Sequence, residues 1–323
     1  MHRFSMTISR IKKAGKPWLL KQTRNPWFTT LKNGLTNGYY QTEKAIFSPY
    51  SNLEKQRYIH GSSVDSLLLP YFLGIGTPQS GTTWLYQNLR CHSELFLPVQ
   101  KEVSYFDKHF HRSLRYYSKY FTSGHTKVKG EISPNYCIIP SERIRFIRKI
   151  MPDVRLILIM RNPIDRIWSN ARRMFSIIAS DEGKTLEEID ESEFYAFFQA
   201  DYAYNWRGIK RTPGDFINES NRGNYPKILD NWLKIFPREQ LCVVFFDDIA
   251  TSPKRVLNMI FRHIGVSTNV DWNFFPYKQT INKNPEVDIP PKFRVYLEDM
   301  FCRDIEVLYE RFGSPVEKWR CSS

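Results

Sequence analysis

The chain has 323 residues, of which 41% are hydrophobic and 15% aromatic, enough for a large folded core. No apolar run approaches the roughly 20 residues that a membrane-spanning helix needs, and the first residues lack a signal-peptide core, so we expect a cytoplasmic protein. A formal net charge of +14 indicates an anionic partner, such as a nucleotide, a glycan, nucleic acid or a lipid surface.

The cysteines support the same expectation about location. They are five in number, scattered, and in neither a metal-binding spacing nor a CxxC pair. We therefore expect reduced thiols, as in cytoplasmic proteins, at Cys91, Cys137, Cys242, Cys302 and Cys321. No cluster of histidine and acidic residues indicates a metal site, so no metal is predicted.

The first 66 residues are predicted to form a basic, partly mobile segment. Eight Lys and Arg residues precede Glu43, which is the first acidic residue of the chain. A solvated tail is the favoured interpretation of such a charge run, and a peripheral contact with an anionic surface is the alternative.

From residue 67 to residue 315 strand and helix patterns alternate, which predicts a single domain. Short and mostly apolar runs predict strands at 71–75, 128–132, 154–160 and 241–246. Amphipathic patterns predict helices at 141–149, 163–175, 225–236 and 291–312. The fold class expected is α/β, a doubly wound parallel sheet of P-loop type with flanking helices, a helical insertion at 176–224 and a C-terminal tail at 316–323.

Residues 76–83 read Gly-Thr-Pro-Gln-Ser-Gly-Thr-Thr, between the first strand and a helical pattern. Such a turn directs backbone N–H groups and the positive end of the helix dipole at one point, which suits a phosphate group. The spacing of Gly76 and Gly81 matches a P-loop, but Thr82 occupies the position of the lysine that triphosphatases require. The turn therefore predicts a phosphate site and disfavours a P-loop nucleotide kinase, the rival within this fold.

A second anion site is predicted after the strand at 154–160. Residues 161–169 read Arg-Asn-Pro-Ile-Asp-Arg-Ile-Trp-Ser, and ligands collect at the carboxyl ends of strands in open α/β sheets. Pro163 suits the first position of a helix. Arg161 and Ser169 could then hold a phosphate through charge-assisted hydrogen bonds, and a surface arginine at a helix start is the alternative.

Residues 97–107 contain a candidate for proton transfer. They read Leu-Pro-Val-Gln-Lys-Glu-Val-Ser-Tyr-Phe-Asp, which sets a Lys-Glu pair among apolar and aromatic residues. In a partly desolvated site Glu102 could accept a proton from a substrate hydroxyl, with Lys101 as a neighbouring cation. A solvated ion pair in a loop is the alternative.

Residues 130–136 read Gly-Glu-Ile-Ser-Pro-Asn-Tyr and join a predicted strand to a Ser-Pro turn. Glu131, Ser133 and Tyr136 are candidates for lining an acceptor pocket. Structural turn chemistry explains the same residues equally well, so both interpretations remain open.

Taken in this order, the four motifs resemble those of the PAPS-dependent sulfotransferases, and most of all the bacterial and glycan-type members similar to heparan sulfotransferases. The resemblance extends from about residue 71 to about residue 291. It implies in-line transfer of a sulfuryl group from PAPS (3′-phosphoadenosine 5′-phosphosulfate) to a hydroxyl or amine group. A carbohydrate is the acceptor class expected, and no metal is required in this family.

The resemblance also implies a role for each residue that matches a family motif. Arg161 and Ser169 would hold the 3′-phosphate, Trp84 would flank the adenine, and Glu102 would be the general base. A late loop at 280–285 would close over the nucleotide with Asn282 and Lys283. The residues that would hold the 5′-phosphosulfate are Gln79, Ser80, Gly81, Thr82 and Thr83.

Two residues depart from the family pattern. Gln79 stands where the family has a lysine that neutralises the leaving oxygen. Either Lys101 or another cation compensates, or the chain is a PAPS-binding protein with weak or no activity. Ser104 stands where many relatives have a histidine, which leaves the contacts with the acceptor open.

The charge of +14 suggests a nucleic-acid-binding protein as a rival from another functional class. Its basic residues, however, are dispersed or lie in the first 66 residues. The sequence contains no helix-turn-helix, zinc-finger or RNA-binding signature, so no nucleic acid is expected as a partner.

Overall fold

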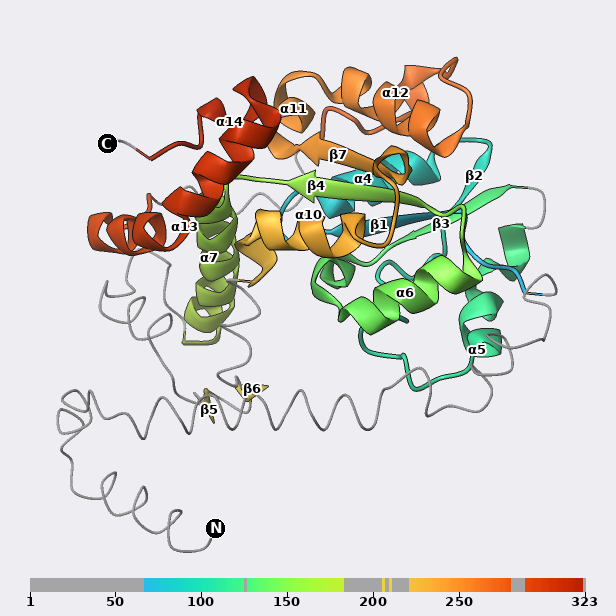
Figure 1. The fold of residues 1–323 in the computed structure, drawn as a ribbon, viewed down its shortest axis with the longest axis horizontal. Coiled ribbons are helices and arrows are strands. Elements are labelled where there is room, and N and C mark those ends of the chain that lie inside the picture. The colour runs from blue at the N-terminus through green and yellow to red at the C-terminus, as the bar shows by residue number, and fades with distance from the viewer. Residues whose placement is uncertain are drawn as a thin grey trace, which may run out of the picture. The chain divides into compact units, whose positions relative to one another are not determined.

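A parallel sheet of five strands organises the protein (Figure 1). The computed structural model describes residues 67–124, 127–182, 205–206, 209–210, 221–279 and 288–321, and the predicted basic segment at 1–66 lies outside them. The strand order is β2-β3-β1-β4-β7, and every neighbouring pair is parallel. The strands are β1 (Phe72–Gly76), β2 (Leu95–Phe96), β3 (Val128–Ile132), β4 (Arg155–Met160) and β7 (Leu241–Phe245).

The prediction of an α/β fold with a doubly wound parallel sheet is confirmed. The four predicted strands agree with the observed ones to within one residue at each end, and within this sheet only the two-residue strand β2 was not predicted. Strand β4 is buried from Leu156 to Met160, which explains its continuous apolar sequence. A strand covered by helices on both faces has no side chain to expose to water.

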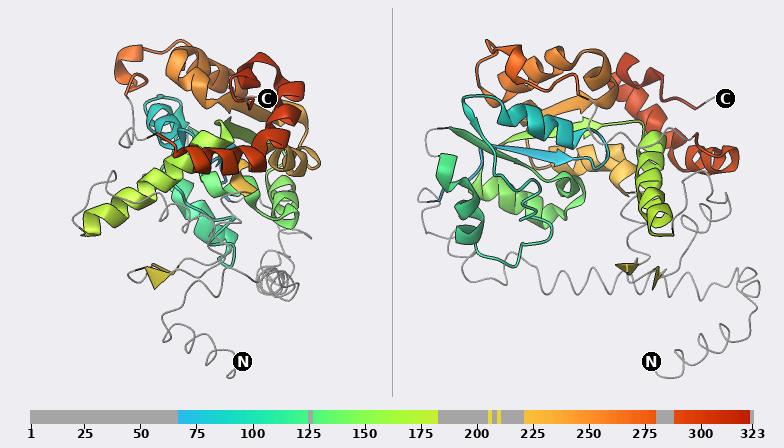
Figure 2. Two further views of the ribbon diagram at one scale, coloured as in Figure 1. Left: turned by 90° about the vertical axis from the view of Figure 1, so that its left-hand side faces the viewer. Right: turned by 180° about the vertical axis from the view of Figure 1, so that it is seen from behind.

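Helices cover both faces of the sheet (Figures 1 and 2). Helices α4 (Thr82–Arg90) and α12 (Pro253–Ile264) pack on one face, where their apolar side chains share a core with β1, β4 and β7. Helices α6 (Ser141–Ile150) and α10 (Tyr225–Leu233) pack against each other on the opposite face. The apolar stripes of all four helices are buried, and α12 is the one of the four whose pattern was not predicted as a helix.

The remaining elements surround the ends of the sheet. Two helices, α7 (Pro163–Glu182) and α13 (Pro291–Phe312), pack side by side near the carboxyl end of β4. Shorter helices are α5 (Leu114–Ser118), α11 (Phe246–Thr251), α14 (Ser314–Glu317) and the 3₁₀ helices Lys119–Gly124, Pro134–Ile138, Arg238–Gln240 and Trp272–Phe274.

The predicted helical insertion at 176–224 is described only in part. Helix α7 extends seven residues beyond the predicted end at 175, to Glu182. Further along, β5 (Asn205–Trp206) pairs antiparallel with β6 (Ile209–Lys210), so the described part of the insertion is not wholly helical. Periodicity could not indicate strands of only two residues, because such strands are shorter than the pattern that defines them.

A glycine allows close packing between two of the central strands. Gly130 on β3 pairs with Phe72 on β1, and a Cβ atom at residue 130 would lie 2.0 Å from the Phe72 ring. No side chain fits in that space. The glycine of the Gly-Glu-Ile-Ser-Pro-Asn-Tyr motif therefore serves the sheet, and it brings Glu131 to the point where β3 ends.

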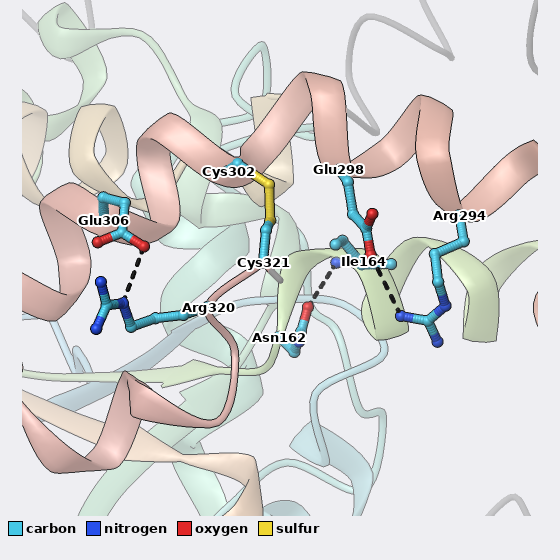
Figure 3. Close-up of a disulfide and its surroundings, with 8 residues drawn as sticks. All are labelled: Asn162, Ile164, Arg294, Glu298, Cys302, Glu306, Arg320 and Cys321. Carbon is cyan, nitrogen blue, oxygen red and sulfur yellow. Dashed lines mark hydrogen bonds and ion pairs between the residues drawn. A yellow bond between two sulfur atoms is a disulfide. The ribbon is translucent and has the colours of Figure 1, made fainter. Parts of the chain in front are cut away.

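One expectation about the cysteines is wrong. Cys302 on α13 and Cys321 near the end of the chain form a disulfide, with their Cα atoms 5.8 Å apart (Figure 3). The sequence could not reveal this pair, because the two residues are 19 positions apart and meet only when the chain folds back along α13. Cys91, Cys137 and Cys242 are free thiols, as expected. Within the described residues, no helix is both long and apolar enough to cross a membrane.

Candidate functional site

The candidate residues come together where the parallel strands end. Register pairs Gly74 of β1 with Ile132 of β3, and Met160 of β4 with Phe245 of β7. The segments that follow these strands therefore emerge at one edge of the sheet. This is the edge at which open α/β sheets bind ligands.

The turn at 76–83 forms the first part of the site. Its last glycine, Gly81, has a φ of 87°, a left-handed conformation that glycine adopts without steric cost, and it begins helix α4. A Cβ atom at this position would also lie 3.2 Å from the Ile249 side chain. Because Gly81 has no side chain to cap the helix, the first N–H groups of α4 remain available to an anion.

The inner side of this turn is fixed by two buried hydroxyl groups. The Thr77 backbone N–H donates to the carbonyl oxygen of Ile159 at 2.9 Å, which ties the turn to β4. The hydroxyl oxygens of Thr77 and Ser80 are 2.8 Å apart and hydrogen-bonded, and both residues are fully buried. Of the other predicted residues, Thr82 is buried, whereas Gln79 and Thr83 are partly exposed.

Arg161 joins the two predicted anion sites into one. Its guanidinium Nη1 donates to the carbonyl oxygen of Gln79 at 3.0 Å, and its Cζ lies 4.5 Å from the centre of the Phe246 ring. Its backbone is held by Tyr225, whose hydroxyl donates to the Arg161 carbonyl oxygen at 2.7 Å and accepts from the Arg161 N–H at 3.1 Å. The strand end after β4 and the turn after β1 are therefore in direct contact.

The surroundings of Arg161 suit an anionic ligand. Burial lowers the pKa of Arg161 from its ordinary value, and the nearby carboxylate of Asp165 opposes this shift. An anion that replaced lost water around the guanidinium would stabilise its charge. Ser169, the second residue predicted for this site, lies about two turns into α7 and is 6% exposed.

The loop at 101–107 carries the predicted base. Lys101 Nζ donates to Glu102 Oε1 at 2.6 Å, and the two side chains are 19% and 40% exposed. Glu102 and Ser104 have positive φ angles of 62° and 53°, which are uncommon for residues other than glycine. Such conformations persist where the surrounding structure enforces them, and they are frequent in functional sites.

A buried carboxylate supports this loop. Glu131 is 2% exposed and accepts hydrogen bonds from the hydroxyls of Tyr117, Ser133 at 2.8 Å and Tyr136 at 2.9 Å. The same Ser133 and Tyr136 oxygens accept from the loop, at 3.0 Å from the Ser104 N–H and 3.2 Å from the Phe106 N–H. The three residues that the sequence offers as acceptor-pocket candidates thus direct their polar groups at one another and at the loop.

Glu131 also has an unusual affinity for its proton. Burial raises its pKa to about 7, and the hydrogen bonds from Tyr117, Ser133 and Tyr136 oppose this shift. A carboxylic acid that is half protonated at neutral pH is costly to bury. Its position at the centre of the network indicates that the fold depends on it there.

Other predicted residues are placed as follows. The Trp84 side chain is 5% exposed and donates from Nε1 to the Tyr277 carbonyl oxygen at 3.0 Å, which links α4 to the segment before the predicted lid. Asn282 and Lys283 lie outside the described residues. Among the residues that the structure does describe, no three His, Cys, Asp or Glu side chains gather into a possible metal site.

Several residues of the site were not predicted as functional. Tyr225 holds the backbone of Arg161, Thr77 anchors the turn, and Tyr117 completes the shell around Glu131. Arg143 donates from Nη1 to the Phe106 and Asp107 carbonyl oxygens at 2.9 and 2.8 Å. Tyr117 and Arg143 lie in helices outside the four motifs, so the spacing of the motifs did not indicate them.

Comparison with known proteins identifies a family for most of the chain. The family model described as the sulfotransferase domain matches residues 70–284, which is more than half of the chain. A solved sulfotransferase from Alicyclobacillus acidocaldarius shares the fold, with a TM-score of 0.60 and 22% identity over 78% of this chain and 99% of that chain.

Two relatives match this chain over only part of their own length. The membrane-associated sulfotransferase kil1 of Dictyostelium discoideum is 22% identical, with 79% of this chain and 67% of the relative covered. The heparan sulfate glucosamine 3-O-sulfotransferase 3B1 of Mus musculus is 25% identical, with 68% of this chain and 52% of the relative covered. The chain thus spans about half to two thirds of the length of these relatives.

The expectation of a cytoplasmic location is wrong. The relative from Dictyostelium is described as membrane-associated. The disulfide between Cys302 and Cys321 agrees with this correction, because disulfides persist mainly in oxidising compartments. The expectation rested on the absence of long apolar runs and on scattered cysteines, and neither feature reports where a protein resides.

Proposed function

Because the chain belongs to the sulfotransferase domain family, we propose that it transfers a sulfuryl group from PAPS to a hydroxyl or amine group of a carbohydrate acceptor. The observation that carries the proposal is the 3.0 Å contact between the Arg161 guanidinium and the Gln79 carbonyl oxygen. It makes one site from two anion-binding corners, as a donor with phosphate groups at two positions requires. The heparan sulfate relative supports the choice of a carbohydrate.

The turn at 76–83 together with Arg161 and Ser169, which we call the cradle, fits this donor. The free N–H groups at the start of α4 and the Thr83 hydroxyl suit the 5′-phosphosulfate, since they offer donors at a partly exposed helix end. The Arg161 guanidinium, with Ser169, suits the 3′-phosphate. When bound, PAPS supplies an activated sulfuryl group, and the cradle residues position it and stabilise its negative oxygens.

Glu102 is the residue we assign as general base. Within the described residues, its side chain has one hydrogen-bond partner, Lys101, and it remains 40% exposed. An acceptor hydroxyl can therefore reach the carboxylate and give up its proton as it attacks. The hydrogen bonds to the Ser104 and Phe106 N–H groups hold the backbone of the loop that carries Glu102, and Lys101 holds the carboxylate itself.

The charge that Gln79 lacks has a candidate replacement in Arg161. Lys101 is engaged with Glu102, whereas the Arg161 guanidinium contacts the Gln79 residue itself. We therefore assign Arg161, rather than Lys101, as the cation that serves the turn. A PAPS-binding protein with weak or no activity is the second candidate function, because removing one transition-state donor typically costs about 10²–10³ in rate.

Calorimetric titration of the whole chain with PAP (adenosine 3′,5′-bisphosphate, which is PAPS without its sulfuryl group), AMP, ATP and a DNA duplex tests the donor assignment. PAP is expected to bind with micromolar affinity, and AMP, which lacks the 3′-phosphate, at least tenfold more weakly. Equal binding of PAP and AMP, or preferential binding of DNA, would exclude the proposal. Transfer of labelled sulfate from PAPS to a panel of glycans then separates an active enzyme from an inactive PAPS-binding protein.

A further inference from the structure

The C-terminal segment, residues 313–321, lies beyond the residues that match the family model and was expected to be a tail from residue 316. It is folded onto the domain. Helix α14 begins after Gly313, and the Val316 and Trp319 side chains are 0% and 3% exposed. Burying a tryptophan is a large stabilising contribution, so this segment is an integral part of the folded domain.

Trp319 contacts three residues beside the candidate donor site. Its indole Nε1 donates to Asp247 Oδ2 at 2.8 Å. Its ring centre lies 6.4 Å from that of Tyr225 and 5.8 Å from that of Phe245, the last residue of β7. One side chain therefore bridges α10 and the carboxyl end of β7.

Two of these contacts, those with Tyr225 and Asp247, lead to Arg161. The Tyr225 hydroxyl fixes the Arg161 backbone through two hydrogen bonds. Asp247 follows Phe246, whose ring lies against the guanidinium, and the Asp247 carboxylate favours the guanidinium charge. Trp319 does not contact Arg161 directly, but it holds the residues that decide where the guanidinium lies.

One disulfide and one ion pair attach the segment to α13 (Figure 3). Cys321 is bonded to Cys302, and Arg320 Nε is 3.0 Å from Glu306 Oε1. The close-up of the disulfide also contains Asn162 and Ile164, which lie on either side of Pro163, the first residue of helix α7. Both cysteines are partly exposed, so a reductant in solution can reach the disulfide.

We propose that Trp319 is a positioning residue of the donor site, which sets Arg161 for the 3′-phosphate through Tyr225 and Asp247, and that the Cys302–Cys321 disulfide keeps it in place. The inference rests on the proposed function, because it takes the 3′-phosphate as the ligand of Arg161. It adds to that function a C-terminal element that the family motifs do not include.

The test compares PAP with AMP, since only PAP has the 3′-phosphate. In Trp319→Phe an aromatic ring remains at this position, but the hydrogen bond to Asp247 is lost. We expect the Kd for PAP to rise about three- to tenfold while the Kd for AMP stays unchanged. Trp232→Phe is the matched control: it removes another buried indole bond, from Nε1 to the Cys137 carbonyl oxygen, and should leave the ratio of the two Kd values unaltered.

The disulfide is tested in the same assay. Cys321→Ser, or wild-type protein treated with dithiothreitol, should show the same selective loss of PAP affinity, whereas Cys91→Ser, at an exposed free thiol, should not. If the wild-type chain does not prefer PAP to AMP, the proposed function fails. If it does, and the Trp319 and Cys321 variants keep the wild-type ratio or weaken both ligands equally, the inference about the C-terminal segment is overturned.

Discussion

The turn at 76–83 and the loop at 101–107 border the same edge of the sheet, but different forces fix them. The turn is made largely by its neighbours in the chain: a strand leads in, a helix leads out, and the glycine at 81 allows the left-handed corner between them. One distant contact, from the Thr77 N–H to the Ile159 carbonyl oxygen, ties it to β4. The loop has no regular structure, and its residues 102 and 104 have positive φ, as Gln79 of the turn also has. Side chains 29 to 37 positions away hold it in place.

This difference separates binding from catalysis in the proposed enzyme. Binding of the 5′-phosphosulfate depends on backbone groups that most substitutions leave unchanged, so this part of donor binding should be robust. Proton transfer depends on one carboxylate whose position is set by a buried hydrogen-bond network, so it should be sensitive to changes at several distant positions. Each prediction below changes one of the two regions or a residue that contacts it.

The largest effect is expected for Glu102→Gln. Removing the base should lower kcat about 10²–10⁴-fold, because proton transfer in the transition state then lacks an acceptor. The Kd for PAP should remain within about twofold of the wild-type value, because the cradle is separate. Steady-state kinetics and calorimetry on the same preparation measure both quantities. Wild-type turnover in this variant would show that another group is the base.

The second prediction concerns the support of the loop. The pKa of Glu131 is raised from its ordinary value of 4.5 to about 7 by burial. Between these pH values the folded protein retains a proton that the unfolded chain has released. The contribution of this group to the free energy of unfolding is therefore complete below pH 4.5 and falls by about 3 kcal/mol as the pH rises to 7.

Glu131→Gln should remove this pH dependence. Urea denaturation at several pH values from 4.5 to 8 would show the variant most destabilised relative to wild type at acid pH, with the gap narrowing toward neutrality. Glu142→Gln, at an exposed carboxylate on α6, is the control and should leave the slope unchanged. A constant gap across the pH range would contradict the raised pKa.

The third prediction tests the contact between the two proposed anion-binding corners. Arg161→Lys keeps a positive charge but loses the planar fork that can bond both the Gln79 carbonyl oxygen and a phosphate. We expect the Kd for PAP to rise about tenfold, with a smaller change for AMP. An unaltered preference for PAP would mean that Arg161 does not bind the 3′-phosphate.

Local sequence patterns were sufficient for the fold and for the turn, but they did not reveal contacts between distant segments. Strand limits followed from short apolar runs, and the turn from a strand, a glycine and a helix start in succession. The spacing of Glu131, Ser133 and Tyr136 left a pocket and a structural role equally open, because burial depends on what packs against them. Trp319 and the Cys302–Cys321 pair were missed for a similar reason. Their contacts form only because the chain folds back along α13, and the residues next to them in the sequence do not indicate this.

The smallest effect is expected for Gln79→Lys, which restores the charge that related enzymes have in the turn. Because Arg161 already contacts residue 79, we expect kcat to rise only about three- to tenfold, less than the 10²–10³ that one oxyanion donor typically contributes. Single-turnover measurements of sulfate transfer from labelled PAPS separate this gain from product release. Gln79→Met, of similar size but without a donor, is the matched control and should lower the rate. If the lysine variant is faster by 10² or more, Arg161 does not supply the missing charge, and the two corners of the site act less closely together than their contact implies.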